Sequence, residues 1–186
     1  MDQMRSGGVP DLAIATFVRL YGELEAGATG LIPEADVTPL TGIDRQADLA
    51  VDAEAAKEAM ARTVVIKLNG GLGTSMGLEA AKSLLPVRDG ATFLDLIARQ
   101  VLAARATYDA RIPLVLMNSF RTQEDSLRAL AAYPELAVEG IPADFLQNRE
   151  PKLDAATLEP VVWEADPSLE WCPPGHGDLY TALQTS

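Results

Sequence analysis

The sequence predicts a three-layer α/β fold, in which helices cover both faces of a mostly parallel sheet. An N-terminal helical region precedes it. Apolar, β-branched runs alternate with helical patterns over residues 63–148. The intervals between these runs leave room for the helical crossovers that parallel strands require. Polar loops beginning with asparagine, residues 69–77 and 118–120, follow the first two runs directly. Such loops lie where open α/β sheets bind ligands.

Two helices and a connector are predicted before the first strand. Residues 11–26 carry apolar side chains at helical spacing, with Pro10 as a start signal and Gly27 as a stop signal. Residues 31–49 contain two prolines and mixed polarity, which predicts an extended connector. Residues 51–62 are rich in alanine and charged side chains, which favour a helix. We expect this region to form a solvated helical cover on the domain that follows.

The elements of the predicted sheet begin at Thr63. In chain order they are a strand at 63–69, a helix at 92–109, a strand at 112–120, a helix at 121–133 and a short strand at 140–148. Thr92 and Asp95 have the spacing of a capping box, which marks the start of the first of these helices. Strand, helix, strand, helix and strand at this spacing indicate right-handed βαβ connections.

Composition excludes several classes of protein. The formal net charge is −12, so the surface repels nucleic-acid backbones. Cys172 is the only cysteine, which excludes an intramolecular disulfide framework and favours a cytoplasmic location. No apolar run reaches the ~18 residues of a membrane span, and the first residues lack the apolar core of a secretory leader. His176 is the only histidine, which excludes zinc sites built from several histidines or cysteines.

Residues 69–77, NGGLGTSMG, form the most informative motif. Its four glycines let backbone N–H groups approach a ligand, and consecutive N–H groups bind anions. The Walker pattern does not fit, because Met76 and Ala81 stand where it requires glycines. The dinucleotide fingerprint also fails at Met76. A phosphate-binding loop is therefore favoured over a turn that only permits close packing, and we expect Lys82 to direct its ammonium group toward the loop.

Four stretches of the chain resemble sequence blocks of the UTP–glucose-1-phosphate uridylyltransferases, the UDP-glucose pyrophosphorylase family. They are LNGGLGTSMGLEAAKSLLPV, PLVLMNSFRTQEDS, FLQNREPKLD and WCPPGHGDLYTAL, in the family's order and at similar spacing, and the resemblance covers roughly Thr63 to Leu183. The resemblance implies a Rossmann-like nucleotidyltransferase fold. It also implies reversible transfer of a uridylyl group from UTP to glucose 1-phosphate, giving UDP-glucose and pyrophosphate, with Mg²⁺ as cofactor.

By this resemblance, the nucleotide site draws residues from several of these blocks. The implied UTP-binding residues are Leu68, Asn69, Gly70, Gly71, Lys82, Gln147 and Gly175. Gly70, Gly71 and His176 would also contact the sugar phosphate. Lys82 would be the catalytic residue, because its charge would stabilise the departing pyrophosphate. Gln147 would read uracil, because its amide offers one hydrogen-bond acceptor and two donors.

Other polar residues near these blocks have simpler interpretations. Asp178 is predicted to cap the helix that begins at Leu179 rather than to bind a metal. Lys152 and Arg149 either add positive charge near the nucleotide or lie in an exposed loop. Asn118 ends a strand, and we expect it to pack behind the site.

The chain lacks parts that the family resemblance implies. We expect residues 1–62 to be the helical region and residues 63–186 the first part of the catalytic domain, with the remainder and a C-terminal β-helical domain absent. The metal-binding aspartate and half of the sugar pocket would lie in the absent part, so no metal ligand is expected in this chain. We predict little turnover from it alone. Two alternatives are a broad-specificity UDP-sugar or UDP-N-acetylhexosamine pyrophosphorylase and a non-catalytic nucleotide-binding module.

Overall fold

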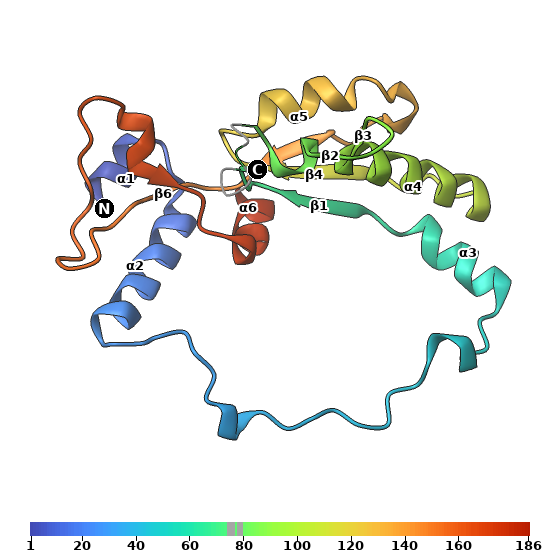
Figure 1. The fold of residues 1–186 in the computed structure, drawn as a ribbon, viewed down its shortest axis with the longest axis horizontal. Helices are drawn as coiled ribbons and strands as arrows, with labels where there is room; N and C mark the ends of the chain where they lie inside the picture. The colour runs from blue at the N-terminus through green and yellow to red at the C-terminus, as the bar shows by residue number, and fades with distance from the viewer. Residues whose placement is uncertain (74–76, 78–79) are drawn as a thin grey trace.

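The computed structural model describes residues 1–73, 77 and 80–186, and it contains a sheet with the strand order β1–β4–β5 (Figure 1). These strands span Val65–Asn69 (β1), Leu114–Asn118 (β4) and Asp144–Leu146 (β5). Both pairings are parallel, and the register places Asn69 beside Asn118 and Asn118 beside Leu146. The three strands therefore end together at one edge of the sheet.

Helices cover both faces of this sheet. The crossover helices α4 (Phe93–Tyr108) and α5 (Gln123–Leu130) lie on one side in Figure 1, and α6 (Leu179–Thr185) lies on the other. The main apolar core gathers residues of α4, α5 and β4 with the turns beside them; its buried members are Leu94, Ala98, Val101, Ala110, Ile112, Leu114, Leu116, Leu130 and Leu136. All of β4 is buried, as expected for a central parallel strand. The predicted three-layer α/β arrangement is confirmed.

Side-chain hydrogen bonds fix both ends of α4. The predicted capping box is present: the Thr92 hydroxyl accepts from the Asp95 N–H at 3.1 Å, and the Asp95 carboxylate accepts from the Thr92 N–H at 2.7 Å. The Tyr133 hydroxyl donates to the same carboxylate at 2.8 Å. Near the other end, Arg105 Nε donates to the Ile112 carbonyl at 2.8 Å. These bonds hold α4 against the segments that follow α5 and precede β4.

The N-terminal region contains α1 (Asp2–Ser6), α2 (Asp11–Glu25) and α3 (Ala53–Ala61). The predictions for α2 and α3 are confirmed, whereas α1 was not predicted. Residues 27–52 are exposed throughout and form a long arch between α2 and α3 (Figure 1). The predicted connector is therefore also confirmed.

A short antiparallel pair joins the N-terminal helices to the segment after β5. It consists of β6 (Glu150–Pro151) and β7 (Trp171–Cys172), and it was not predicted. Trp171 packs against a buried cluster made of Met4, Val9, Ala13 and Ile14. The Arg149 guanidinium lies over the Trp171 ring, 4.6 Å from its centroid, and donates to the Gly7 carbonyl.

The remaining elements are short. They are the antiparallel strands β2 (Pro86–Arg88) and β3 (Ala91–Thr92) and the 3₁₀ turns Glu34–Asp36, Gln46–Asp48, Lys82–Leu84, Pro134–Leu136, Pro167–Glu170 and His176–Asp178. Over the described residues, no helix has the length and apolar character needed to cross a membrane.

Candidate functional site

A connected set of buried polar side chains lies where the strands end. The Asn69 amide donates to Asn118 Oδ1 and to Ser126 Oγ, each at 2.7 Å. Ser83 Oγ donates to Asn69 Oδ1 at 2.6 Å, and Asn118 Nδ2 donates to Asp144 Oδ2 at 2.9 Å. Because buried polar groups that all have partners rigidify their surroundings, this network fixes the carboxyl ends of β1 and β4 and ties them to Asp144, the first residue of β5. The Asn69 side chain is used inside the protein, so only its backbone remains available to a ligand.

Gln147 lies against the first glycine of the loop. Its N–H donates to the Asn118 carbonyl at 2.8 Å, and the residue is buried. A Cβ atom added to Gly70 would lie 2.6 Å from both the nitrogen and the oxygen of the Gln147 amide. Only a glycine leaves room for this amide. The fold therefore brings together two residues that the sequence assigned to one site from separate blocks.

Backbone pairing places Lys82 beside the same loop. The Gly73 N–H donates to the Ala80 carbonyl at 3.1 Å, and the Lys82 N–H donates to the Gly71 carbonyl at 3.0 Å. The Lys82 side chain is exposed, and it forms no ion pair within residues 1–73, 77 and 80–186. The backbone of Lys82 is thus fixed beside Gly71, and the expected direction of its ammonium group stays a prediction. Met76, which the motif comparison used, lies outside the described residues.

A second lysine, Lys67, lies on β1 just before the loop, and the sequence analysis missed it. Its ammonium group donates to the Leu68 carbonyl and lies 3.5 Å from Asn69 Oδ1. Burial lowers the pKa of Lys67, because the charged form is less well solvated there. Leu68 itself is half-buried. The sequence feature that could have indicated Lys67 is its place as a lysine inside an otherwise apolar strand pattern.

The loop of Gly175 and His176 meets the end of β5 through Asp178. Gly175 has φ = 103°, a conformation that favours glycine, and His176 is exposed. The prediction that Asp178 caps α6 is wrong: its side chain makes no capping bond, and its helical backbone geometry differs from the extended geometry of a side-chain cap. Instead, the Asp178 carboxylate accepts from the Asn148 N–H at 2.6 Å and from Asn148 Nδ2 at 2.9 Å.

The charged residues after β5 do not converge on a cation site. Arg149 contacts the Trp171 ring and the Gly7 carbonyl of the N-terminal region. It therefore neither faces the nucleotide site nor lies in an exposed loop, and both predicted positions are wrong. Lys152 is exposed. Glu150 is half-buried, and burial, followed by the negative charge of Asp178, raises the pKa of its carboxyl. Over the part of the chain that the structure describes, no group of three or more acidic, histidine or cysteine side chains could hold a metal.

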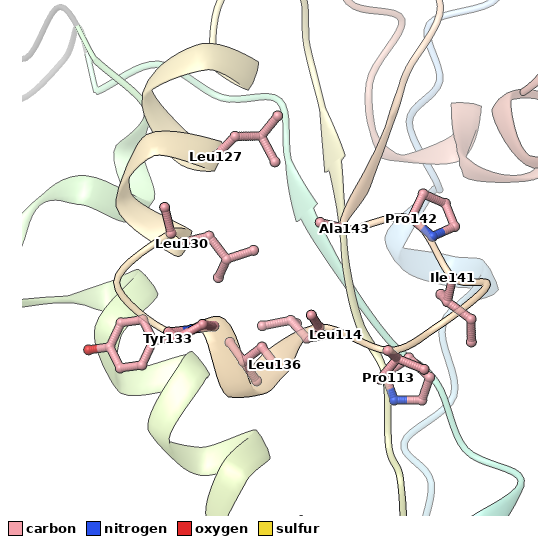
Figure 2. Close-up of a pocket in the computed structure, with 13 residues that line it drawn as sticks. Pro113, Leu114, Leu127, Leu130, Tyr133, Leu136, Ile141, Pro142 and Ala143 are labelled. Atoms are coloured by element: carbon pink, nitrogen blue, oxygen red, sulfur yellow. The ribbon is translucent and has the colours of Figure 1, made fainter.

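An apolar cavity of about 340 Å³ lies away from the edge where the strands end. Figure 2 shows it between α5, the turn after α5 and the segments that lead into β4 and β5. It is lined by Pro113, Leu114, Leu127, Leu130, Ala131, Tyr133, Pro134, Leu136, Ala137, Val138, Ile141, Pro142 and Ala143. A polyphosphate would lose its hydration there without finding a charged partner. The candidate site is therefore the polar edge that carries Gly70, Lys82 and Gln147.

Comparisons with known sequences identify relatives. The family model described as UTP–glucose-1-phosphate uridylyltransferase matches residues 15–186. A UTP–glucose-1-phosphate uridylyltransferase from Solanum tuberosum is 36% identical over 176 residues, which are 91% of this chain and 36% of that protein. A protein with the same name from Saccharomyces cerevisiae is 44% identical over 128 residues, which are 68% of this chain and 25% of that protein.

Solved structures share the fold. A variant UDP-glucose pyrophosphorylase from Leishmania major in complex with UDP-glucose is 40% identical with a TM-score of 0.85, and the match covers 98% of this chain and 38% of that one. A UDP-glucose phosphorylase from Trypanosoma brucei is 39% identical with a TM-score of 0.80, and the match covers 99% of this chain and 38% of that one. The matches thus span between a quarter and little more than a third of the length of these relatives. It belongs to the UTP–glucose-1-phosphate uridylyltransferase family.

Proposed function

We propose that the chain supplies the nucleotide half-site for reversible uridylyl transfer from UTP to glucose 1-phosphate. A phosphate oxygen of glucose 1-phosphate attacks the α-phosphorus of UTP, and the bond from that phosphorus to the bridging oxygen of pyrophosphate breaks. UDP-glucose forms, and pyrophosphate leaves with the bond's electron pair. The contact between the Gly70 backbone and the Gln147 amide carries the proposal. It places the glycine loop proposed to bind the phosphates beside the side chain proposed to recognise uracil.

Each proposed residue contributes positioning or charge. Backbone groups of Leu68, Asn69, Gly70 and Gly71 would line the nucleotide, as backbone N–H groups do in other anion-binding loops. Lys82 would neutralise charge that develops on the departing pyrophosphate. Gln147 would pair with a uracil carbonyl and with N3–H.

The second loop completes the proposed half-site. Gly175 would approach the nucleotide closely, because it has no side chain to obstruct contact. His176 would contact the sugar phosphate, together with Gly70 and Gly71. No protein nucleophile is needed, since this transfer depends on alignment and charge stabilisation.

Mg²⁺ belongs to the proposal through the family resemblance. When bound, it would supply charge neutralisation on the transferring phosphate. The described residues offer no acidic cluster for it, so the donor set among them does not fit a metal site. A cytoplasmic location is likewise proposed, from the cysteine usage alone.

Calorimetric titration of the chain with UTP and with ATP, in Mg²⁺, tests the proposal. We expect UTP-selective binding that the Lys82→Ala variant weakens by about tenfold or more, the effect of one charge-assisted contact. Lys57→Ala is the matched control, because Lys57 is exposed on α3 and pairs with Asp109. Equal heats for UTP and ATP, or unchanged UTP affinity in Lys82→Ala, would argue against the assignment.

A coupled assay for pyrophosphate release addresses turnover. We expect residues 1–186 alone to form little UDP-glucose, because they span little more than a third of the length of the Solanum tuberosum and Leishmania major relatives. Robust turnover by the purified chain would overturn that expectation and would show that residues 1–186 suffice.

A further inference from the structure

Asp178 makes a two-point contact with one residue on a different loop. One carboxylate oxygen accepts from the Asn148 backbone N–H at 2.6 Å, and the other accepts from Asn148 Nδ2 at 2.9 Å. Asp178 is 8% exposed, and it takes part in no ion pair over the residues that the structure describes. Burying a carboxylate is costly unless strong donors compensate it. The two Asn148 donors provide this compensation, which makes the contact specific as well as strong.

The contact fixes the residue that follows Gln147. On one side, the Gln147 N–H donates to the Asn118 carbonyl at 2.8 Å, which continues the pairing of β5 with β4. On the other side, Asn148 is held by Asp178 through both its backbone and its side chain. The backbone N–H groups of Gln147 and of the next residue are therefore both anchored, and the Gln147 side-chain amide lies against Gly70.

Asp178 also belongs to the turn that presents His176. This turn spans His176–Asp178 and follows Gly175, whose φ is 103°. The Asp178 N–H donates to the Gly175 carbonyl at 3.2 Å, which closes the turn. A single side chain thus connects the loop of Gly175 and His176 to the strand end that carries Gln147.

We propose that Asp178 is a positioning residue. By holding Asn148, it fixes the position of Gln147 relative to the Gly175–His176 loop and thereby sets selectivity for the uracil base. The inference rests on the proposed function, in which Gln147 reads uracil. A purely structural role would weaken all ligands together or lower stability alone. A positioning role predicts a larger loss for UTP than for inorganic triphosphate, which has phosphates but no base.

Exchanging the aspartate and the asparagine between positions 178 and 148 provides the test. Asp178→Asn removes the charge of the acceptor: the new amide still accepts from the Asn148 N–H, and the Asn148 amide can rotate to accept from the new N–H₂, so both bonds become neutral and weaker. Asn148→Asp opposes two carboxylates, which repel each other. In the double variant the new amide at position 178 accepts from the backbone N–H of residue 148 and donates to the new carboxylate there, so both bonds return with the same net charge.

Dissociation constants for UTP and for inorganic triphosphate, measured in Mg²⁺, decide the outcome. We expect each single variant to weaken UTP about tenfold, the effect of losing charge-assisted bonding between residues 178 and 148, while triphosphate changes less than about threefold. The double variant should return within about threefold of the parent chain for UTP. Equal loss for the two ligands, or no recovery in the double variant, would overturn the proposal.

Two controls keep the test decisive. If Asp178→Asn does not fold, as judged by circular dichroism, Asn148→Ala replaces it, because that variant loses only the side-chain bond and keeps the backbone bond. It should weaken UTP more than triphosphate, and the opposite order would refute the positioning role. If the unaltered chain shows no preference for UTP, the proposed function itself fails, and this result is distinct from failure of the Asp178 proposal.

Discussion

Replacing Gly70 by alanine would place a methyl group where the Gln147 amide now lies. The added Cβ would be 2.6 Å from both polar atoms of that amide, and ordinary van der Waals contact begins at 3.4 Å. The amide must therefore withdraw by roughly 0.8 Å or rotate away. Because the amide is the end of a flexible side chain and Gly70 does not have a positive φ, the move costs little free energy of folding. The cost falls on base recognition.

The size of this effect follows from the hydrogen bonds that the displaced amide can no longer make. Two neutral hydrogen bonds to uracil, each contributing about 1 kcal/mol, correspond to about a 30-fold rise in the UTP dissociation constant. Inorganic triphosphate should change less than about threefold, because it has no base to lose. Calorimetry with both ligands measures the ratio, and urea unfolding checks that stability is retained.

Gly22→Ala is the matched control for this experiment. Gly22 lies inside α2, and a Cβ there meets nothing within 4 Å, so UTP affinity should be unchanged. If Gly70→Ala weakened both ligands equally, the loop would act on phosphate alone. If it left UTP affinity intact, the contact between Gly70 and Gln147 would have no part in base recognition.

Two further predictions concern stability. Thr92→Ala removes the cap of α4 and should lower the free energy of unfolding by about 1 kcal/mol, measured by urea denaturation; a change below the experimental error would show that the capping box contributes nothing. Glu150→Gln should stabilise the chain at neutral pH. Burial raises the folded-state pKa of Glu150 above its ordinary 4.5, so the folded state binds the proton of this carboxyl more tightly than the unfolded state does. The parent chain therefore loses stability as the pH rises from 4.5 through the folded-state pKa. The variant should match the parent near pH 4 and exceed its melting temperature near pH 7; the same difference at both pH values would contradict this account.

Local signals in the sequence were sufficient for the central sheet. The β-branched and apolar run of β1 and the apolar run of β4 predict buried strands, and the spacing of Thr92 and Asp95 predicts the observed start of α4. These features depend on neighbouring residues, so they can be read without knowledge of tertiary contacts. The fold class was predictable for the same reason.

Features that depend on distant contacts were not predictable. The pair β6–β7 joins strands separated by a long loop, and its Trp171 packs against N-terminal residues such as Met4. Asp178 stands before a helix, so its sequence position favours a cap, yet Asn148 provides two donors that only the fold brings within reach. Periodicity and spacing contain no information about such partners.

Amide chemical-shift mapping of the ¹⁵N-labelled chain during a UTP titration tests the central claim most directly, because it locates the ligand. We expect the largest shifts at Gly70, Gly71 and Gln147, with smaller shifts at Leu130 and Leu136 in the apolar cavity. Inorganic triphosphate should reproduce the shifts at the glycines and leave Gln147 nearly unchanged. Largest shifts at Leu130 and Leu136, with none at the glycines, would contradict a nucleotide site at the edge where the strands end.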